Sequence, residues 1–216
     1  MTYTGAVQMG GPPAVRELAQ LTITKQSVGP IDNNAYLLRC RQTGEQLLID
    51  AANDSHKLLD LIGEAGLTAV VTTHQHNDHW MALTDVLEET GAESIAHAAD
   101  AGALPTVTRT VSDGDTIRVG ACELEVIHLV GHTPGSIALL YRDPAGHPHL
   151  FTGDSLFPGG PGRTTGGEDF DSLMSDLQRK IFDRLPDDTW FYPGHGNDST
   201  LGAERPSIPE WLARRW

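Results

Sequence analysis

The first part of the chain shows the alternation of apolar and polar positions that is typical of β-strands. Val, Ile, Leu, Thr and Tyr recur in short runs, and Gly, Pro, Asn and Asp fill the gaps between them. The pattern predicts a meander of three strands over residues 21–28, 35–40 and 45–51. A helical period follows over residues 56–66, and either of two preceding residues is expected to cap that helix, Asn53 or Asp54.

The run LTAVVTT, residues 67–73, is almost continuously apolar. Strands that are buried on both faces have this composition, so we expect a central strand of a sheet here. One face of a helix should follow, marked by Trp80, Leu83, Val86 and Leu87. That helix should stop near Gly91, because glycine favours the left-handed conformation at helix ends.

The second part of the chain repeats this organisation. Four further strands are predicted, over residues 115–119, 121–130, 136–143 and 147–154. An apolar stripe with the helical period then begins behind Glu168 and Asp169, and it consists of Phe170, Leu173, Met174, Leu177, Ile181 and Leu185. Strands and helices in this order, without an internal repeat or a linker, predict an α/β fold in one domain over 1–216, with two mixed β-sheets packed face to face and helices outside.

Charge and composition exclude several classes of partner. Asp and Glu number 29 against 15 Lys and Arg, a formal net charge of -14, which should repel nucleic acid and anionic membranes. No apolar run approaches the length of a membrane span, and the first residues lack the pattern of a signal peptide. Cys40 and Cys122 have neither CxxC spacing nor the density of a disulfide scaffold and are expected as half-buried thiols. These features predict a cytoplasmic protein.

Histidines and an aspartate crowd into the stretch THQHNDHW, residues 73–80, directly after the predicted central strand. On a helix His74, His76 and His79 could not share one face, but a strand that ends in a turn can direct them to one point. Imidazole nitrogen and carboxylate oxygen are ligands of zinc and related divalent metals, so these histidines and Asp78 predict a metal site on a loop.

Three more potential ligands stand at later strand ends. His132 lies in VGHTPGS, Asp154 in LFTGDSLF and His195 in YPGHG, each beside a glycine that allows a tight turn. Loops on a rigid sheet often carry functional side chains, and the shared position of these three residues favours one site that they complete together.

The motifs THQHNDH, GHTPGS, TGDSLF and YPGHG, in this order, resemble the metallo-β-lactamase-fold hydrolase superfamily over residues 20 to 200. The resemblance implies an αβ/βα four-layer sandwich with the site along one edge of its two sheets. It also implies a first metal held by His74, His76 and His132, a second held by Asp78, His79 and His195, and Asp154 as the bridge between them.

Within the superfamily, TGDSLFPGGPGRT and YPGHG are most similar to the glyoxalase II (hydroxyacylglutathione hydrolase) branch, which hydrolyses thioesters of glutathione. That branch carries a C-terminal helical domain, whereas this sequence ends at Trp216, and it commonly has a tyrosine where Asn197 stands here. Weak binding of glutathione is therefore expected. Arg163 resembles a basic position of the branch and is expected to bind a substrate carboxylate.

The ligand set implies catalysis by two divalent metal ions, with zinc expected and iron or manganese as alternatives. Two such ions can share a hydroxide, which would attack a small-molecule thioester, with an ester or lactone as the next choice. Asp78 and Asp154 are the catalytic carboxylates of this scheme. Asp50 is expected to orient a metal-binding histidine by accepting a hydrogen bond from the ring nitrogen that does not bind the metal.

Two other functions remain open. A persulfide dioxygenase resembles the same scaffold but uses one iron, here held by His74, His132 and Asp154. A metal-binding protein without catalysis is the third possibility.

Other residues carry weaker expectations. His147 and His149 are expected in a hairpin loop. The tail over residues 204–216, with Trp211 and Trp216 beside two arginines, predicts a docking helix, and a homo-oligomer contact is the alternative.

Overall fold

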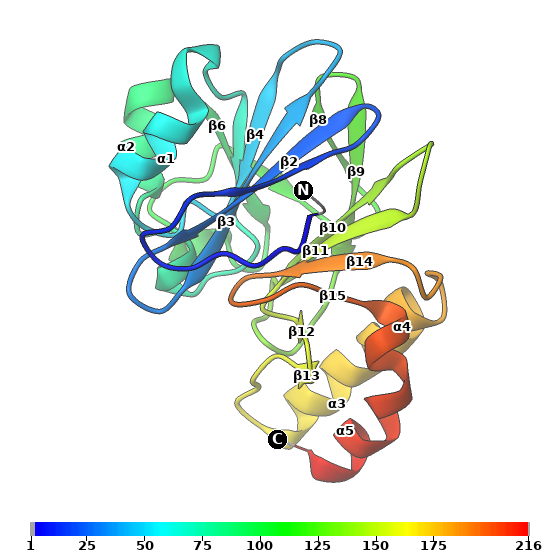
Figure 1. The fold of residues 1–216 in the computed structure, drawn as a ribbon. Helices are drawn as coiled ribbons and strands as arrows, with labels where there is room; N and C mark the ends of the chain where they lie inside the picture. Colours follow the sequence, from blue (N-terminus) through cyan, green and yellow to red (C-terminus); the bar gives the residue numbers. More distant parts are fainter. Residues whose placement is uncertain (1–2, 216) are drawn as a thin grey trace.

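Two mixed β-sheets face each other in the computed structural model, which describes residues 3–215 (Figure 1). The first sheet is antiparallel over its first four strands and parallel from β4 onward. Its strands, in spatial order, are β1 (Ala14–Glu17), β2 (Leu21–Val28), β3 (Asn33–Cys40), β4 (Gln46–Ile49), β5 (Ala69–Val71), β6 (Glu93–His97) and β7 (Arg109–Val111).

The second sheet is antiparallel except where β11 pairs with β14 in parallel. Its spatial order is β15 (Ser199–Thr200), β14 (Trp190–Pro193), β11 (Pro148–Gly153), β10 (Ile137–Arg142), β9 (Cys122–His128) and β8 (Thr116–Val119). A small hairpin of β12 (Leu156–Phe157) and β13 (Gly160–Pro161) follows β11.

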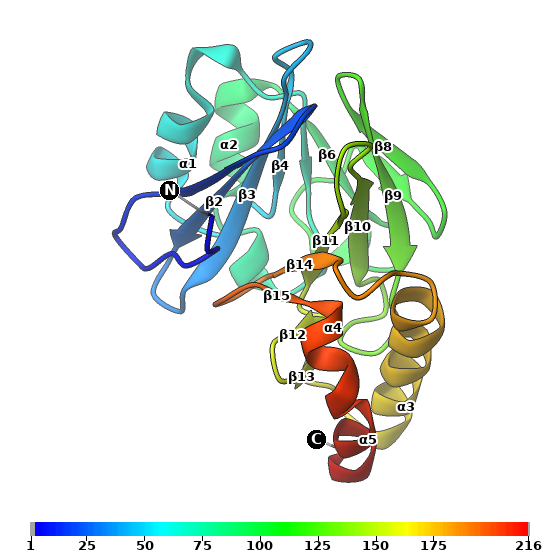
Figure 2. The same cartoon turned by 45° about the vertical axis from the view of Figure 1, so that its right-hand side comes forward.

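Helices cover the outer face of each sheet (Figure 2). On the first sheet lie α1 (Ser55–Ile62) and α2 (Leu83–Thr90). On the second lie α3 (Gly167–Asp176), its π-helical continuation over Leu177–Phe182, α4 (Leu201–Glu204) and α5 (Ile208–Arg214). Short 3₁₀ turns span Gly63–Ala65, Asn77–His79, Ala101–Ala103 and Arg205–Ser207.

The alternation of side chains along the strands produces the layers. In β4, Leu47 and Ile49 enter the core between the sheets, while Leu48 packs under α1 and α2. In the second sheet Leu139 faces the central core and Leu140 faces the outer helices. Three apolar layers therefore separate four structural layers, which confirms the predicted α/β fold of two packed sheets with helices outside.

The eight strands predicted with residue ranges are present as β2 to β5 and β8 to β11, and β14 is the strand whose end carries His195. Strands β1, β6 and β7 and the two-residue strands β12, β13 and β15 were not expected. Strands β1, β6 and β7 have only three to five residues and mixed composition, so they show no clear period of two. Asp54, one of the two expected residues, is the N-cap residue of α1, but its side chain does not cap the helix. Its carboxylate accepts a hydrogen bond from Gly29 N instead, and Asn53 Oδ1 accepts from Asp54 N.

The C-terminal segment docks on its own chain. Trp211 in α5 is 1% exposed and packs with Phe182 in the outer core of the second sheet. The docking prediction is thus satisfied within the chain for Trp211, whereas Trp216 lies outside the described residues. Among residues 3–215, no helix is long and apolar enough to cross a membrane.

Two expectations on burial are wrong. Cys40 and Cys122 are fully buried free thiols rather than half-buried ones. His149 does not lie in a hairpin loop but in β11, where it is 0% exposed, while His147 precedes the strand and contacts Arg16. His149 Nδ1 lies 2.9 Å from the Tyr192 hydroxyl, and its Nε2 has no hydrogen-bond partner in the described part of the chain.

We expect His149 to make the fold sensitive to acid. Burial, together with the charges of Arg16 and His147, lowers the pKa of His149 to about 3. Above its ordinary pKa of about 6.5 both the folded and the unfolded chain are neutral here, and the group adds no pH dependence. Below that value the unfolded chain binds a proton that the folded chain does not. The free energy of unfolding should fall by up to about 1.4 kcal/mol per pH unit, or about 2 kcal/mol by pH 5.

Urea unfolding of wild type and His149→Gln at pH 7 and pH 5 measures this effect. The variant should lose about 2 kcal/mol less than wild type over that interval. His56→Gln, at an exposed position in α1, serves as the control and should follow wild type. Equal losses in wild type and His149→Gln would show that His149 is not the source of the acid sensitivity.

Candidate metal centre

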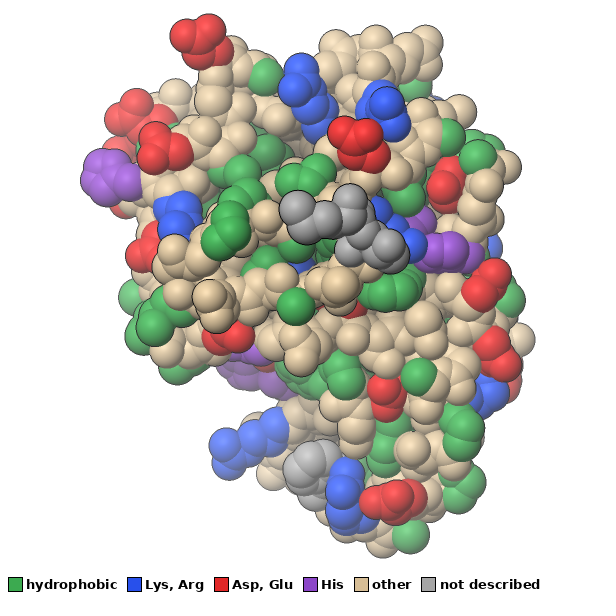
Figure 3. Space-filling view, viewed as in Figure 1, with side chains coloured by type: hydrophobic (Ala, Val, Ile, Leu, Met, Phe, Trp, Pro, Cys, Tyr) green, Lys and Arg blue, Asp and Glu red, His purple; other side chains and the backbone are tan. Residues whose placement is uncertain are grey.

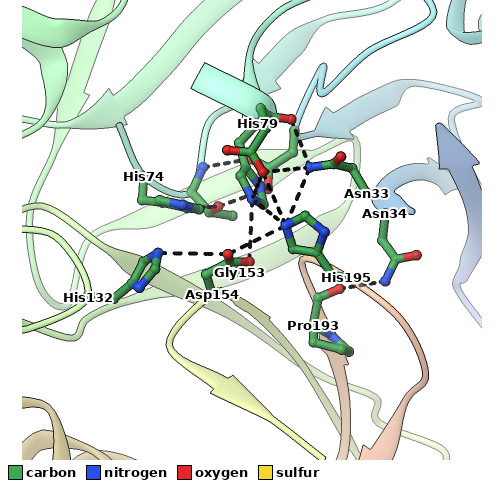
Figure 4. A network of polar contacts seen from close by, with 12 residues as sticks. Asn33, Asn34, His74, His79, His132, Gly153, Asp154, Pro193 and His195 are labelled. Atoms are coloured by element: carbon green, nitrogen blue, oxygen red, sulfur yellow. Dashed lines mark hydrogen bonds and ion pairs between the residues drawn. The ribbon is translucent and has the colours of Figure 1, made fainter. Parts of the chain in front are cut away.

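Four strand ends bring the predicted ligands to one edge of the two sheets. The segment after β5 carries His74, His76, Asp78 and His79, the loop after β9 carries His132, and Asp154 and His195 follow β11 and β14. Figure 4 shows His74, His79, His132 and His195 around the Asp154 carboxylate.

Three groups of side chains have ligand atoms within 4.8 Å of one another. The groups are His74, His76 and His132; His74, His79 and Asp154; and Asp78, His79 and His195. The structure thus brings together all seven residues that the sequence proposed as ligands. Their role as ligands remains a prediction.

The nitrogen atoms of these rings are oriented in a common way. Four of the rings place Nδ1 against an oxygen outside the centre: Thr73 Oγ1 for His74 at 3.0 Å, Asp50 Oδ2 for His79 at 2.8 Å, the Arg163 carbonyl for His132 at 2.7 Å and the Ile31 carbonyl for His195 at 3.2 Å. An Nδ1–H that donates outward leaves the lone pair of Nε2 free to bind a metal. The Nε2 atoms of these four rings therefore suit metal binding.

The spacing of the inward atoms fits a cation. His79 Nε2 and His195 Nε2 lie 3.2 Å apart, and Asp78 Oδ2 lies 3.3 Å from His195 Nε2. Two nitrogen lone pairs that face each other repel, so this contact requires either a proton on one of the two nitrogens or a metal ion between them. Four ligands placed tetrahedrally about 2.0–2.1 Å from zinc would lie about 3.3 Å from each other, which is close to these separations.

Unsatisfied atoms point to the same conclusion. His74 Nε2, His132 Nε2 and Asp154 Oδ1 are buried and have no hydrogen-bond partner among residues 3–215. A buried polar atom without a partner costs about 1–3 kcal/mol, so three of them in one place require an explanation. Metal ligation would satisfy all three, and the residues present therefore fit the metal ions that the sequence predicts.

Burial and neighbouring charges shift the pKa values of His79 and His74 in opposite directions. Burial disfavours a charged His79 ring, but the Asp50 and Asp154 carboxylates outweigh burial and raise its pKa to about 10. Burial and the neighbouring histidines, His79 first, lower the pKa of His74 well below its usual value. Burial works against an ionised Asp154 carboxyl, yet the surrounding histidines, with His79 foremost, lower its pKa. The centre therefore favours an ionised Asp154, which suits metal binding.

Asp50 holds His79 and the end of β5 together. Its side chain is 2% exposed and accepts hydrogen bonds from Thr73 N and Thr73 Oγ1, both at 2.8 Å, besides facing His79 Nδ1. Asp50 itself adopts a positive φ of 58°, an uncommon conformation for a residue with a side chain. The carboxylate thus stands behind His79, at the place where the sequence proposed an orienting residue.

A family model described as the metallo-beta-lactamase superfamily matches residues 28–195. The chain belongs to this superfamily. The matched range contains all seven candidate ligands, and the predicted four-layer sandwich is the architecture observed.

Curated relatives place the chain near one branch of the superfamily. Hydroxyacylglutathione hydrolase of Polaromonas sp. strain JS666 is 41% identical over 166 residues, which are 76% of this chain and 62% of the relative. The chain therefore spans less than two thirds of the length of this relative. The name of this relative agrees with the resemblance to glyoxalase II that the sequence motifs show.

Solved structures of similar proteins share the fold. The protein TTHA1623, in a di-iron-bound form, is 31% identical with a TM-score of 0.70, and the match covers 85% of this chain and 98% of that one. ETHE1 from Myxococcus xanthus is 29% identical with a TM-score of 0.76, over 88% of this chain and 84% of that one.

Several residues that support the centre of this superfamily member were missed in the sequence. Asn33 Nδ2 donates to Asp78 O at 2.9 Å and to Asp78 Oδ2 at 3.0 Å. Asn34 Nδ2 donates to the carbonyls of Pro193 and Gly196, and so fixes the loop that carries His195 (Figure 4). The only signal was an Asn-Asn pair at the start of a strand, and polar pairs at that position are common.

Glycine is required at one point of the centre. A Cβ atom on Gly194 would lie 2.1 Å from Asp154 Oδ1 and 2.6 Å from His79 Cε1. Any side chain at this position would displace two candidate ligands, which explains the glycine that precedes His195.

Arg163 contributes to the centre in a way the sequence did not indicate. Its carbonyl oxygen accepts the hydrogen bond from His132 Nδ1, while its exposed side chain lines a cavity beside the centre. Its proposed contact with a substrate carboxylate stays a prediction.

Proposed function

We propose that the protein is a metal-dependent hydrolase that cleaves a small-molecule thioester at a centre of two divalent metal ions. The observation that carries the proposal is the convergence of seven His and Asp side chains, among which His74 Nε2, His132 Nε2 and Asp154 Oδ1 are buried without a hydrogen-bond partner in residues 3–215. Zinc is the proposed metal, and iron or manganese would fit the same donors. The thioester is supported by similarity to hydroxyacylglutathione hydrolase, and two metals by similarity to a di-iron protein.

Bound divalent ions would supply an activated water and would polarise the substrate carbonyl. His74, His76 and His132 would hold one ion, and Asp78, His79 and His195 the other. Asp154 reaches both groups, since its oxygens lie 3.4 Å from His79 Nε2 and 3.8 Å from His132 Nε2. The proposed bridging role rests on this position.

The protein groups would position the reaction rather than supply a nucleophile. Asp78 is the more exposed candidate carboxylate, at 27% of its side chain, so it can meet the attacking water, and Asn33 holds its Oδ2 atom. We propose that Asp78 orients that water. Asp50 faces His79 Nδ1 and would keep a proton there, so Nε2 would be the atom that exchanges its proton for a metal ion.

A panel of substrates with metal-defined protein tests the proposal. We expect about two metal ions per chain and hydrolysis of acyl thioesters faster than of matched oxygen esters and lactones. Elemental analysis and thiol release measure the two quantities. One tightly bound iron, with oxygen consumed on a persulfide, would instead assign the chain to the dioxygenase class, and bound metal without turnover of any substrate would make it a binding protein.

We also propose a cytoplasmic location and no nucleic-acid partner. Cys40 and Cys122 are both unbonded thiols, as is usual in a reducing compartment, and the net charge of -14 opposes binding to polyanions.

A further inference from the structure

Asp100 is a buried carboxylate that is not among the candidate metal ligands. It stands in the turn over residues 98–100, directly after β6, and is 1% exposed. Figure 3 shows histidine side chains at the surface, where the upper and lower parts of the molecule meet. A substrate can approach such exposed side chains but not Asp100. Any effect of Asp100 on the metal centre must therefore act through the residues that it contacts.

The Asp100 carboxylate joins two loops that belong to different sheets. Its Oδ2 atom accepts hydrogen bonds from Gln75 N at 2.9 Å and from Thr133 Oγ1 at 2.6 Å. Its Oδ1 atom accepts a hydrogen bond from Gly135 N at 2.7 Å. Gln75 lies in the loop after β5 of the first sheet, whereas Thr133 and Gly135 lie in the loop after β9 of the second. One buried side chain thus holds the two loops together.

These two loops carry one complete group of candidate ligands, the first group, which consists of His74, His76 and His132. Gln75 stands between the first two histidines, and Thr133 directly follows the third. Side chains that bind a metal must be held within about 0.5 Å of the productive geometry. The contacts of Asp100 are therefore placed where they can set the spacing of the whole first group.

The packing around Asp100 is tight. A Cβ atom on Gly135 would lie 2.7 Å from Asp100 Cγ, N and Oδ1, so the close approach of this loop requires glycine. A separate hydrogen bond joins the two sheets nearby, from Ile137 N to Thr73 O at 2.9 Å. Loss of the Asp100 contacts should therefore loosen the two loops without separating the sheets.

We propose that Asp100 is a positioning residue of the metal centre, which holds the loops of the first group at the spacing that one metal ion requires. Asp50 has the corresponding place at the second group (Asp78, His79 and His195), where it faces a ring nitrogen of His79. Asp100 differs because it binds backbone N–H groups and a hydroxyl of the loops instead of a ring. This inference rests on the two-ion centre of the proposed function.

Asp100→Asn tests this role. An amide has one acceptor oxygen, so its NH₂ group must face either Gly135 N–H or Gln75 N–H, and two buried donors then lie against each other. We expect zinc to bind the first group about 10- to 100-fold more weakly, as is usual when a residue that orients ligands is lost. Zinc titration in competition with a chelator measures the affinity. At limiting free zinc the variant should hold about one ion per chain.

The place of the remaining ion distinguishes positioning from a general loss of stability. With one ion bound to Asp100→Asn, imidazole ¹⁵N NMR should show zinc-dependent shifts at Nε2 of His79 and His195 but not of His132. Asp50→Asn should show the opposite pattern. Equal loss of zinc from both groups in Asp100→Asn, or wild-type affinity at both, would overturn the proposal.

Gln46→Leu is the control for lost stability. Gln46 is also buried, and its side chain donates to the Ile62 and Gly66 carbonyls at the end of β4 opposite Asp50. The variant should have a lower free energy of unfolding but should bind two zinc ions with wild-type affinity. Weaker zinc binding in this variant, to the same extent as in Asp100→Asn, would show that stability and not positioning controls the metal content.

A milder pair of variants removes one contact of Asp100 and keeps its carboxylate. Thr133→Val has nearly the same shape but lacks the hydroxyl that donates to Asp100, so it should weaken zinc binding at the first group by a smaller factor than Asp100→Asn. Thr133→Ser keeps the hydroxyl and should bind zinc like the wild type. Equal zinc affinities in Thr133→Val and Thr133→Ser would contradict the proposed contact.

Turnover separates this inference from the proposed function. If the wild type binds two zinc ions and hydrolyses no thioester, while Asp100→Asn loses the ion of the first group, the positioning role stands and the hydrolase proposal fails. If the wild type hydrolyses thioesters and Asp100→Asn binds both ions normally, the hydrolase stands and the positioning role is wrong. A wild type that binds fewer than two zinc ions would contradict both.

Discussion

Asp154→Ala is expected to reduce thioester hydrolysis on the order of a thousandfold and to remove most of the bound metal. Asp154 is the carboxylate that reaches both groups of ligands, with Oδ1 at 3.4 Å from His79 Nε2 and Oδ2 at 3.8 Å from His132 Nε2. Without it, the His74 and His132 side would have only neutral imidazoles against a divalent charge. The loss should therefore affect both metal ions rather than one.

Ser155→Ala is the matched control for this experiment. Ser155 is the next residue and fully buried, and its hydroxyl has no hydrogen-bond partner within the residues that the structure describes. The variant should keep about two metals and turnover within a few fold of wild type. Elemental analysis after gel filtration and kcat/KM on one thioester give the comparison. A hundredfold loss in Ser155→Ala, with metal retained, would indicate a serine nucleophile and would contradict the two-metal mechanism.

The positions of the candidate ligands could be predicted because their signals are local. A ligand-type residue at the end of an apolar strand, beside a glycine, is visible in a window of a few residues, as for His132 in VGHTPGS and His195 in YPGHG. Strand ends on one edge of a sheet also meet by geometry, so even the convergence of distant motifs follows from local patterns.

The residues that hold the ligands could not be predicted, because their partners lie far away in the sequence. Asn34 donates to the Pro193 carbonyl across 159 positions, and buried Lys25 donates to the Gly196 carbonyl across 171. Nothing near Lys25 in the sequence indicates that its ammonium group will be buried. The same limit explains His149, whose burial depends on Tyr192 from a neighbouring strand.

Asp50→Asn is expected to weaken binding of the metal at the Asp78, His79 and His195 group by about 10- to 100-fold, with a similar loss of turnover. Asp50 Oδ1 accepts from Thr73 N, while Oδ2 accepts from Thr73 Oγ1 and faces His79 Nδ1. An amide has one oxygen. If that oxygen keeps the bond to Thr73 N, the amide NH₂ group faces His79 Nδ1, and the proton of the ring moves to Nε2, where it blocks the metal. If the amide is flipped, its oxygen faces His79 Nδ1 and its NH₂ group faces Thr73 N–H. Two buried donors then lie against each other without an acceptor, which is unfavourable.

Metal titration and imidazole ¹⁵N NMR would distinguish this positioning role from a general loss of stability. At limiting free zinc, Asp50→Asn should hold about one ion per chain, since Asp50 faces His79 directly but reaches the group of His74, His76 and His132 only through the Thr73 hydroxyl. The NMR spectrum should show the proton of His79 on Nε2 instead of Nδ1. Asp176→Asn is the control, because Asp176 is also a buried carboxylate, accepts from Val130 N and pairs with Arg179. Asp176→Asn should lower the free energy of unfolding but still bind two metal ions per chain. Two ions in Asp50→Asn, with His79 still protonated on Nδ1, would show that Asp50 serves the fold and not the metal centre.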